Sequence, residues 1–127
     1  MTRAAALAVL GLRVAYGAGL VAATERLGRP WLGAGVAQAP AKVGLRALGV
    51  REVALHGGAI AAALRGQPLR PWLVASLAGD VTDIVWTYLA RDEVPDGAPV
   101  KTLGAAGGSA LLTLAVAAPP ARSAAVG

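Results

Sequence analysis

The sequence contains no cysteine and no phenylalanine, and it has only one histidine among its 127 residues. Without cysteine the chain cannot form a disulfide, a thiolate zinc site or a thiol nucleophile. Charged residues are also scarce: they make up 15% of the chain, whereas soluble domains carry about 25%. These absences exclude a disulfide-stapled scaffold, and they argue against an ordinary soluble domain.

Small and aliphatic residues take the place of the missing types. Hydrophobic residues make up 56% of the chain, and there are 17 glycines, which would weaken helices in water but allow close helix packing in a membrane. The net charge is +5, yet the basic residues are spread singly from Arg3 to Arg122. We therefore expect the lipid bilayer as partner and no nucleic acid.

Four apolar segments predict transmembrane helices, at 4–23, 50–65, 72–90 and 101–118. The last is the clearest, because 20 uncharged residues between Lys101 and Arg122 are enough to cross a hydrocarbon core of about 30 Å. A cleaved signal peptide is the alternative for the first segment, and a soluble bundle is the alternative for all four. The soluble bundle would need polar outer faces, which these segments lack.

The rest of the chain completes a single membrane domain. Residues 41–48 alternate apolar and basic side chains and predict a short interfacial helix, and residues 119–127 predict a flexible tail. The fold class is thus an all-α bundle of about four transmembrane helices with one interfacial helix. We expect a multi-pass protein of the cell (inner) membrane. The count of basic residues favours external termini, but the even number of spans favours both termini in the cytoplasm, which we adopt.

Charged residues within the predicted spans are the most informative feature. Each costs about 2.5–3.5 kcal/mol at the bilayer centre on insertion scales, so each needs a partner or water. Asp80 and Asp83 share one helix face, and Glu52 and His56 share another. Antiparallel packing of the second and third spans would place His56 near Asp83 or Thr87. The candidate cluster comprises Arg13, Arg51, Glu52, His56, Asp80 and Asp83.

Three functions remain open for this cluster. It is foremost an ion-pair network that holds together a structural or scaffold protein, alone or with a homo-oligomeric or membrane-protein partner. Alternatively, Glu52, Asp80 and Asp83 couple protons or ions in an oligomeric transporter or channel. A third possibility is an isomerase or cyclase with a carboxylic general acid in a lipophilic pocket. With His56 neutral, two guanidiniums nearly compensate three carboxylates, so we assign no metal, no cofactor and no catalytic residue.

Two further sequence patterns are a glycine pair in the last span and a motif shared with a protein family. Gly104 and Gly108 form a G-x-x-x-G pair, which predicts a helix-packing ridge in the last span. The run from Lys42 to Gly58, which contains an R-x-L-G-x-R-E motif at the start of the second span, and the D-x-x-D of the third span resemble a family of short four-helix membrane proteins of high-GC actinobacteria. The resemblance covers most of the chain and implies the four-helix membrane fold, but no activity. His56 stands where that family has a small or apolar residue.

Overall fold

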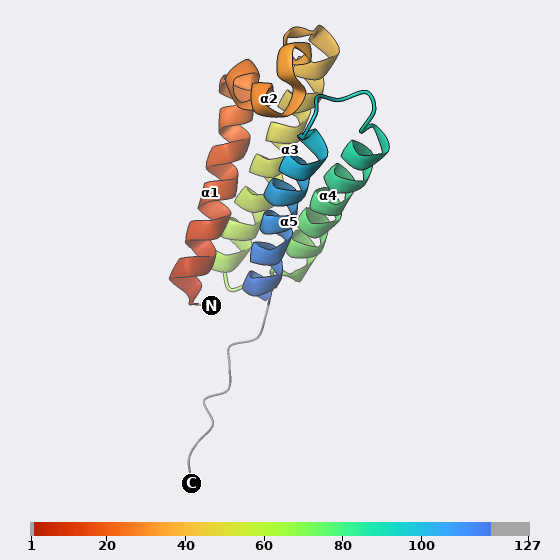
Figure 1. The fold of residues 1–127 in the computed structure, drawn as a ribbon. Coiled ribbons are helices and arrows are strands. Elements are labelled where there is room, and N and C mark those ends of the chain that lie inside the picture. Colours follow the sequence, from red (N-terminus) through yellow and green to blue (C-terminus); the bar gives the residue numbers. More distant parts are fainter. Residues whose placement is uncertain (1, 118–127) are drawn as a thin grey trace.

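The computed structural model describes residues 2–117, and within that range the chain is almost entirely helical. The elements in chain order are α1 (Arg3–Ala22), α2 (Thr24–Leu32), the 3-10 helix η1 (Gly33–Ala37), α3 (Ala39–Leu64), α4 (Arg70–Leu89) and α5 (Ala98–Ala117). Four long helices stand side by side, and α2 and η1 cap one end of them (Figure 1). The start of α1 and the end of α5 lie at the opposite end.

The all-α prediction is confirmed, and the spans are confirmed in part. Helices α1, α3 and α5 are each long and apolar enough to cross a membrane. Helix α4 has 20 residues but falls outside this set, because Asp80 and Asp83 lower its hydropathy. The predicted tail 119–127 lies outside the described residues.

The separate interfacial helix predicted at 41–48 is wrong. These residues form the first part of α3, which runs without a break for 26 residues. Pro40 lies in the first turn of α3, where a proline needs no backbone donor, and no second proline interrupts the helix up to Leu64. The short helix outside the bundle is instead α2, in a segment that the sequence analysis treated as a connection.

Local chemistry explains where the first helices begin and end. Thr2 precedes α1, and its side chain accepts a hydrogen bond from the Ala5 amide. At the other end, Thr24 Oγ1 donates to the Leu20 carbonyl oxygen at 2.7 Å, which satisfies a carbonyl that the break at Ala23 would leave unpaired. Gly66, at a φ of +67°, turns the chain from α3 towards α4.

The bundle consists of two tightly packed pairs of helices. Helix α1 packs mainly on α3 and α5 mainly on α4, whereas α1 and α5 make almost no contact. The α1–α3 pair is closest at Gly17 and Gly49, where a Cβ atom added to Gly17 would lie 2.6 Å from the Gly49 carbonyl oxygen. Only glycine at these two positions allows the helix backbones to approach so closely.

Two apolar clusters hold the bundle, one towards each end. Leu10, Ala59 and Leu73 form one cluster. Leu20, Val36 and Leu45 form the other, beneath η1. Along α1, α3 and α4 the charged residues of the predicted cluster fall between them, so a polar layer interrupts the core at mid-height.

Candidate functional site

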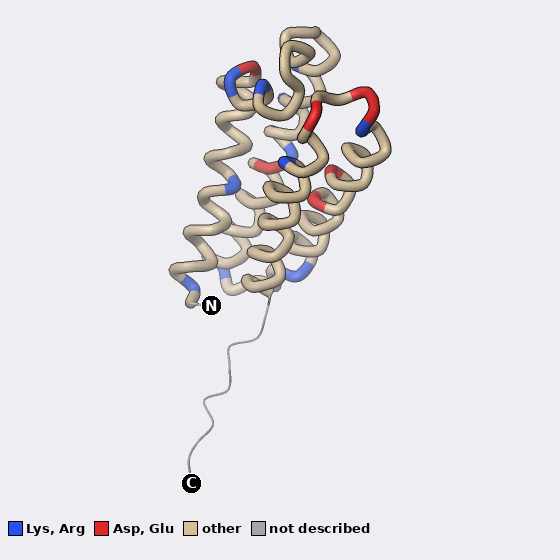
Figure 2. Tube along the Cα trace, in the orientation of Figure 1, with Lys and Arg blue, Asp and Glu red and all other residues tan. Residues whose placement is uncertain are grey.

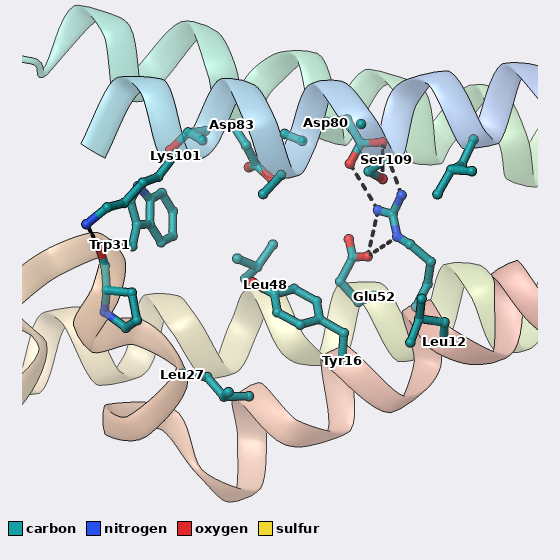
Figure 3. A pocket seen from close by; sticks show the side chains of 17 residues that line it. Leu12, Tyr16, Leu27, Trp31, Leu48, Glu52, Asp80, Asp83, Lys101 and Ser109 are labelled. Carbon is teal, nitrogen blue, oxygen red and sulfur yellow. Dashed lines mark hydrogen bonds and ion pairs between the residues drawn. The ribbon is translucent and has the colours of Figure 1, made fainter. Parts of the chain in front are cut away.

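Arg13 is the centre of the polar layer. Its Nε and Nη2 atoms both donate to Glu52 Oε2, at 2.9 and 2.7 Å, and its Nη1 and Nη2 atoms donate to the two oxygens of Asp80, at 3.2 and 3.0 Å (Figure 3). One guanidinium from α1 therefore joins carboxylates from α3 and α4. This contact places Arg13 and Asp80 at a similar depth in the bundle.

The side chains of these ion pairs are largely buried. The Arg13 side chain is 12% exposed, and those of Glu52 and Asp80 are each 4% exposed. Ser109 of α5 adds a fourth helix to the network, because its hydroxyl donates to Asp80 Oδ2 at 2.8 Å. Removing Arg13 would leave the buried Asp80 carboxylate without its cation.

A second ion pair extends the network towards the capped end of the bundle. Arg51 donates to the two oxygens of Asp83 at 2.8 and 3.4 Å, and more distantly to Glu52 Oε1 at 3.4 Å. Its guanidinium lies over Gly79, where an added Cβ would lie 3.0 Å from Arg51 Cζ. Two arginines and three carboxylates thus form one continuous chain of ion pairs. Most other charged residues lie at the two ends of the bundle (Figure 2).

His56 is buried but does not contact Asp83 or Thr87, so its predicted position is wrong. Its Nδ1 lies 2.8 Å from the Glu52 carbonyl oxygen and its Nε2 lies 2.9 Å from Ser76 Oγ. Because α3 and α4 are antiparallel, residues further along α3 meet earlier residues of α4. The neutral tautomer with a proton on Nδ1 satisfies both contacts, since Nε2 then accepts from the serine hydroxyl. His56 is a hydrogen-bonded core residue beside the ion pairs.

A cavity of about 630 Å³ lies between α1 and α2 on one side and α5 on the other. The ion pairs of Arg13 with Glu52 and Asp80 lie towards one end of it, the inner end, and Asp83 lies between them and Trp31 (Figure 3). The walls along its length are largely apolar, from Leu12, Leu27, Leu48, Ala105, Ala106 and Leu112. Along α5 it extends from Lys101 to Leu112, which corresponds to about 16 Å at 1.5 Å per residue. The cleft exists because α1 and α5 belong to different helix pairs.

Two polar atoms of residues that line this cleft have no hydrogen-bond partner within residues 2–117. They are Trp31 Nε1 and Thr102 Oγ1, and both atoms are buried. Thr102 as a whole is 7% exposed. Buried donors without partners cost free energy, and native structures satisfy most of them. A bound molecule with an oxygen or nitrogen acceptor would satisfy these two.

A second cavity, of about 470 Å³, lies beside α2 and the first half of α3. It shares Trp31, Leu48 and Asp83 with the cleft, and Arg51 lines it as well. The Arg51–Asp83 ion pair therefore borders both spaces.

Gly104 and Gly108 do not pack against another helix in the described part of the chain. A Cβ atom added at either would meet nothing within 4 Å, and Gly108 instead lines the cleft. The glycines that do bring helices together are Gly17 and Gly49, which sequence reasoning missed. Their signal was faint: each lies within a turn of a charged residue of the network, four after Arg13 and three before Glu52. Ser76 and Ser109 were missed too, and nothing in the sequence marked them.

Metal binding has little support in the arrangement of side chains. Across residues 2–117, no group of three or more His, Asp or Glu side chains is placed to hold a metal ion. The carboxylate oxygens of Glu52, Asp80 and Asp83 already accept hydrogen bonds from guanidinium groups. The site can instead offer a polar surface at the end of an apolar cleft.

Comparison with known proteins adds no family to this description. No family model, no curated protein and no solved structure matches the chain. The resemblance to the actinobacterial membrane family therefore stays a prediction, and function must be argued from the geometry.

Proposed function

We propose that this chain is an integral membrane protein that binds a lipophilic small molecule in the cleft between α1 and α5. The observation that carries the proposal is the cleft itself: about 630 Å³ with apolar walls and a charged inner end. Ligand pockets of drug-sized molecules span about 300–1,000 Å³ and combine apolar walls with a few polar groups. The unpartnered Thr102 and Trp31 atoms support a ligand that brings hydrogen-bond acceptors.

The proposal takes α4 as a fourth span, beside α1, α3 and α5. Asp80 and Asp83 would make such a span costly on their own. Their ion pairs with Arg13 and Arg51 offset that cost, because the charges would enter the bilayer already compensated. The protein would then be a four-span protein of the cell membrane, with both ends of the bundle's chain in the cytoplasm.

Within this proposal the ion-pair network has a structural task. It fastens four helices around the cleft and keeps its inner end polar. This agrees with the expectation that the ion pairs hold the bundle together, whereas the scaffold or interaction function expected from the sequence stays a prediction. Catalysis on the same ligand has weaker support. Asp80 accepts hydrogen bonds from Arg13 and Ser109, so its oxygens are poorly available for proton transfer to a substrate.

The test uses two glycines of α5 that differ in one respect. Gly108 lines the cleft and Gly104 does not, while a Cβ at either meets nothing within 4 Å. The full chain in lipid nanodiscs is labelled with a photoactivatable decanol, and the labelled residues are mapped by mass spectrometry. We expect saturable labelling on α1 and α5 in the wild type and in Gly104→Leu, and its loss in Gly108→Leu. Equal saturable labelling in both variants would refute the proposal.

Transport is a second candidate function, favoured by the second cavity. Because Trp31, Leu48 and Asp83 line both cavities, a ligand or ion that leaves the cleft at its outer end would next meet the other space. The Arg51–Asp83 pair would then stand on the route, in an assembly of two or more copies. Flux of the ligand into liposomes, abolished by Gly108→Leu, would support transport, and binding without flux would count against it.

A further inference from the structure

The charges around the cleft define the kind of molecule that it takes. Two guanidiniums, from Arg13 and Arg51, face three carboxylates, from Glu52, Asp80 and Asp83, and this leaves one negative charge. In its neutral tautomer, which satisfies both of its hydrogen bonds, His56 adds no charge to this balance. One uncompensated charge in a low-dielectric site attracts a single positive charge strongly.

Lys101 is the other charged residue that lines the cleft, and its ammonium already has a partner outside the ion-pair network. Its ammonium donates to the Pro30 carbonyl oxygen at 2.7 Å at the capped end of the bundle, and the residue is exposed. Eight residues of α5 separate it from Ser109, or about 12 Å along the helix axis. Solvent screens such an exposed charge much more than it screens the buried pairs.

The carboxylate most available to a ligand is that of Asp83. Its side chain is 24% exposed, against 4% for Glu52 and for Asp80, and it lines the cleft. In Figure 3 it lies in the middle of the cleft, between the labelled Trp31 and the Arg13 network. The excess negative charge is therefore presented where a ligand would lie.

Aromatic rings give a second, independent indication. The chain has only three tryptophans and two tyrosines, and two of these five residues, Tyr16 and Trp31, line the cleft with Asp83. The faces of such rings attract ammonium and other organic cations. Aromatic rings together with a carboxylate are the usual recognition set for an organic cation in an apolar site.

We propose that the ligand of the cleft is a lipophilic organic cation, an amine or quaternary ammonium ion that also carries an uncharged oxygen acceptor for Thr102 and Trp31. Its positive charge pairs with Asp83 between Tyr16 and Trp31. The inference rests on the proposed function, because it assigns a charge to the molecule that the cleft binds. An inorganic divalent ion would bring twice the charge that the site lacks and would find the carboxylate oxygens already engaged.

The test compares two ions of nearly the same shape and opposite charge. Tetraphenylphosphonium and tetraphenylborate are measured for binding to the full chain in nanodiscs, with protein-free nanodiscs as the partition control. We expect tetraphenylphosphonium to bind at least tenfold more tightly. Binding at least as tight by tetraphenylborate would overturn the inference.

Two charge variants should change the affinity for tetraphenylphosphonium in opposite directions. Asp83→Asn brings the balance to zero and should weaken tetraphenylphosphonium binding at least tenfold. Arg51→Gln removes a positive charge, which brings the balance to −2, and it should strengthen tetraphenylphosphonium binding severalfold. This variant also tests the inference if Asp83→Asn does not fold. Unchanged or weaker binding by Arg51→Gln would contradict the inference.

The two proposals fail in different ways. If decanol labelling depends on Gly108 but tetraphenylphosphonium has no preference over tetraphenylborate, the cleft binds lipophilic molecules without selecting cations. If no probe responds to Gly108→Leu, the cleft is not a binding site, and both proposals fall.

Discussion

Arg13 meets Glu52 through two donors on one oxygen, with Nε and Nη2 at 2.9 and 2.7 Å from Oε2. The same guanidinium also binds both oxygens of Asp80. One side chain of α1 therefore binds Glu52 of α3, 39 residues later in the chain, and Asp80 of α4, 67 residues later.

Arg13→Gln should destabilise the bundle by about 3–5 kcal/mol, because it leaves the buried Asp80 carboxylate without a cation and Glu52 with only the more distant Arg51. Thermal and denaturant unfolding in detergent measure the loss. Arg65→Gln, at an exposed position, is the control and should change stability little. A double-mutant cycle of Arg13→Gln with Asp80→Asn should give a coupling above about 1 kcal/mol. Additive effects would mean that the pair does not hold the helices together.

Gly17→Ala should separate α1 from α3 and destabilise the protein by about 1–3 kcal/mol, the usual cost of overpacking. The matched control is Gly11→Ala on the same helix, where an added Cβ meets nothing within 4 Å. Gly49→Ala and Gly44→Ala form the equivalent pair on α3. The unfolding midpoints of the four variants check this, and equal midpoints within each pair would show that the close approach is unimportant.

Ser76→Ala should leave His56 Nε2 buried without a hydrogen bond, at a cost of about 1–3 kcal/mol. Because the chain has a single histidine, nitrogen-15 NMR of histidine-labelled protein reports on this ring alone. We expect Nδ1 to give the shift of a protonated nitrogen and Nε2 that of an unprotonated one. The reverse pattern would contradict the assigned tautomer.

The ion pair between Glu25 and Lys42, 2.6 Å apart, should show a pH dependence. The hydrogen bond and charge of Lys42 lower the pKa of the Glu25 carboxyl below its usual value. A lowered pKa in the folded state means that the pair stabilises the protein above the unfolded-state pKa, and that this stabilisation disappears as pH falls through the folded-state pKa. Lys42→Gln should raise the Glu25 pKa, as measured by carbon-13 NMR titration of the carboxyl. An unchanged titration midpoint would mean that the pair does not form in solution.

The sequence predicted the positions of the helices better than it predicted which helices pack against each other. Apolar length identified four long helices, because hydropathy depends on each segment alone. The sequence could not show that 41–48 continues into α3, since amphipathic character alone does not decide whether a segment lies beside a helix or begins it. It also could not show that α1 packs on α3 and stays apart from α5.

The sequence identified the charged residues of the candidate site but not its uncharged residues. A charged residue in an apolar segment demands a partner, so Arg13, Glu52 and Asp80 were identifiable one by one. Ser76, Ser109, Gly17 and Gly49 matter only through what lies opposite them, and a single sequence does not contain that information. His56 was placed at the wrong level of α4 because the antiparallel offset between the helices depends on the length of the turn that joins them.

The position of Arg13 also constrains how the protein is made. The partners of Arg13 are 39 and 67 residues further along the chain. At a synthesis rate of about 5–20 residues per second, Glu52 emerges from the ribosome roughly 2–8 seconds after Arg13. On the proposed membrane arrangement, α1 carries an uncompensated guanidinium during that interval, which costs about 2.5–3.5 kcal/mol at the bilayer centre. On that arrangement α1 should settle into the bilayer only when α3 arrives.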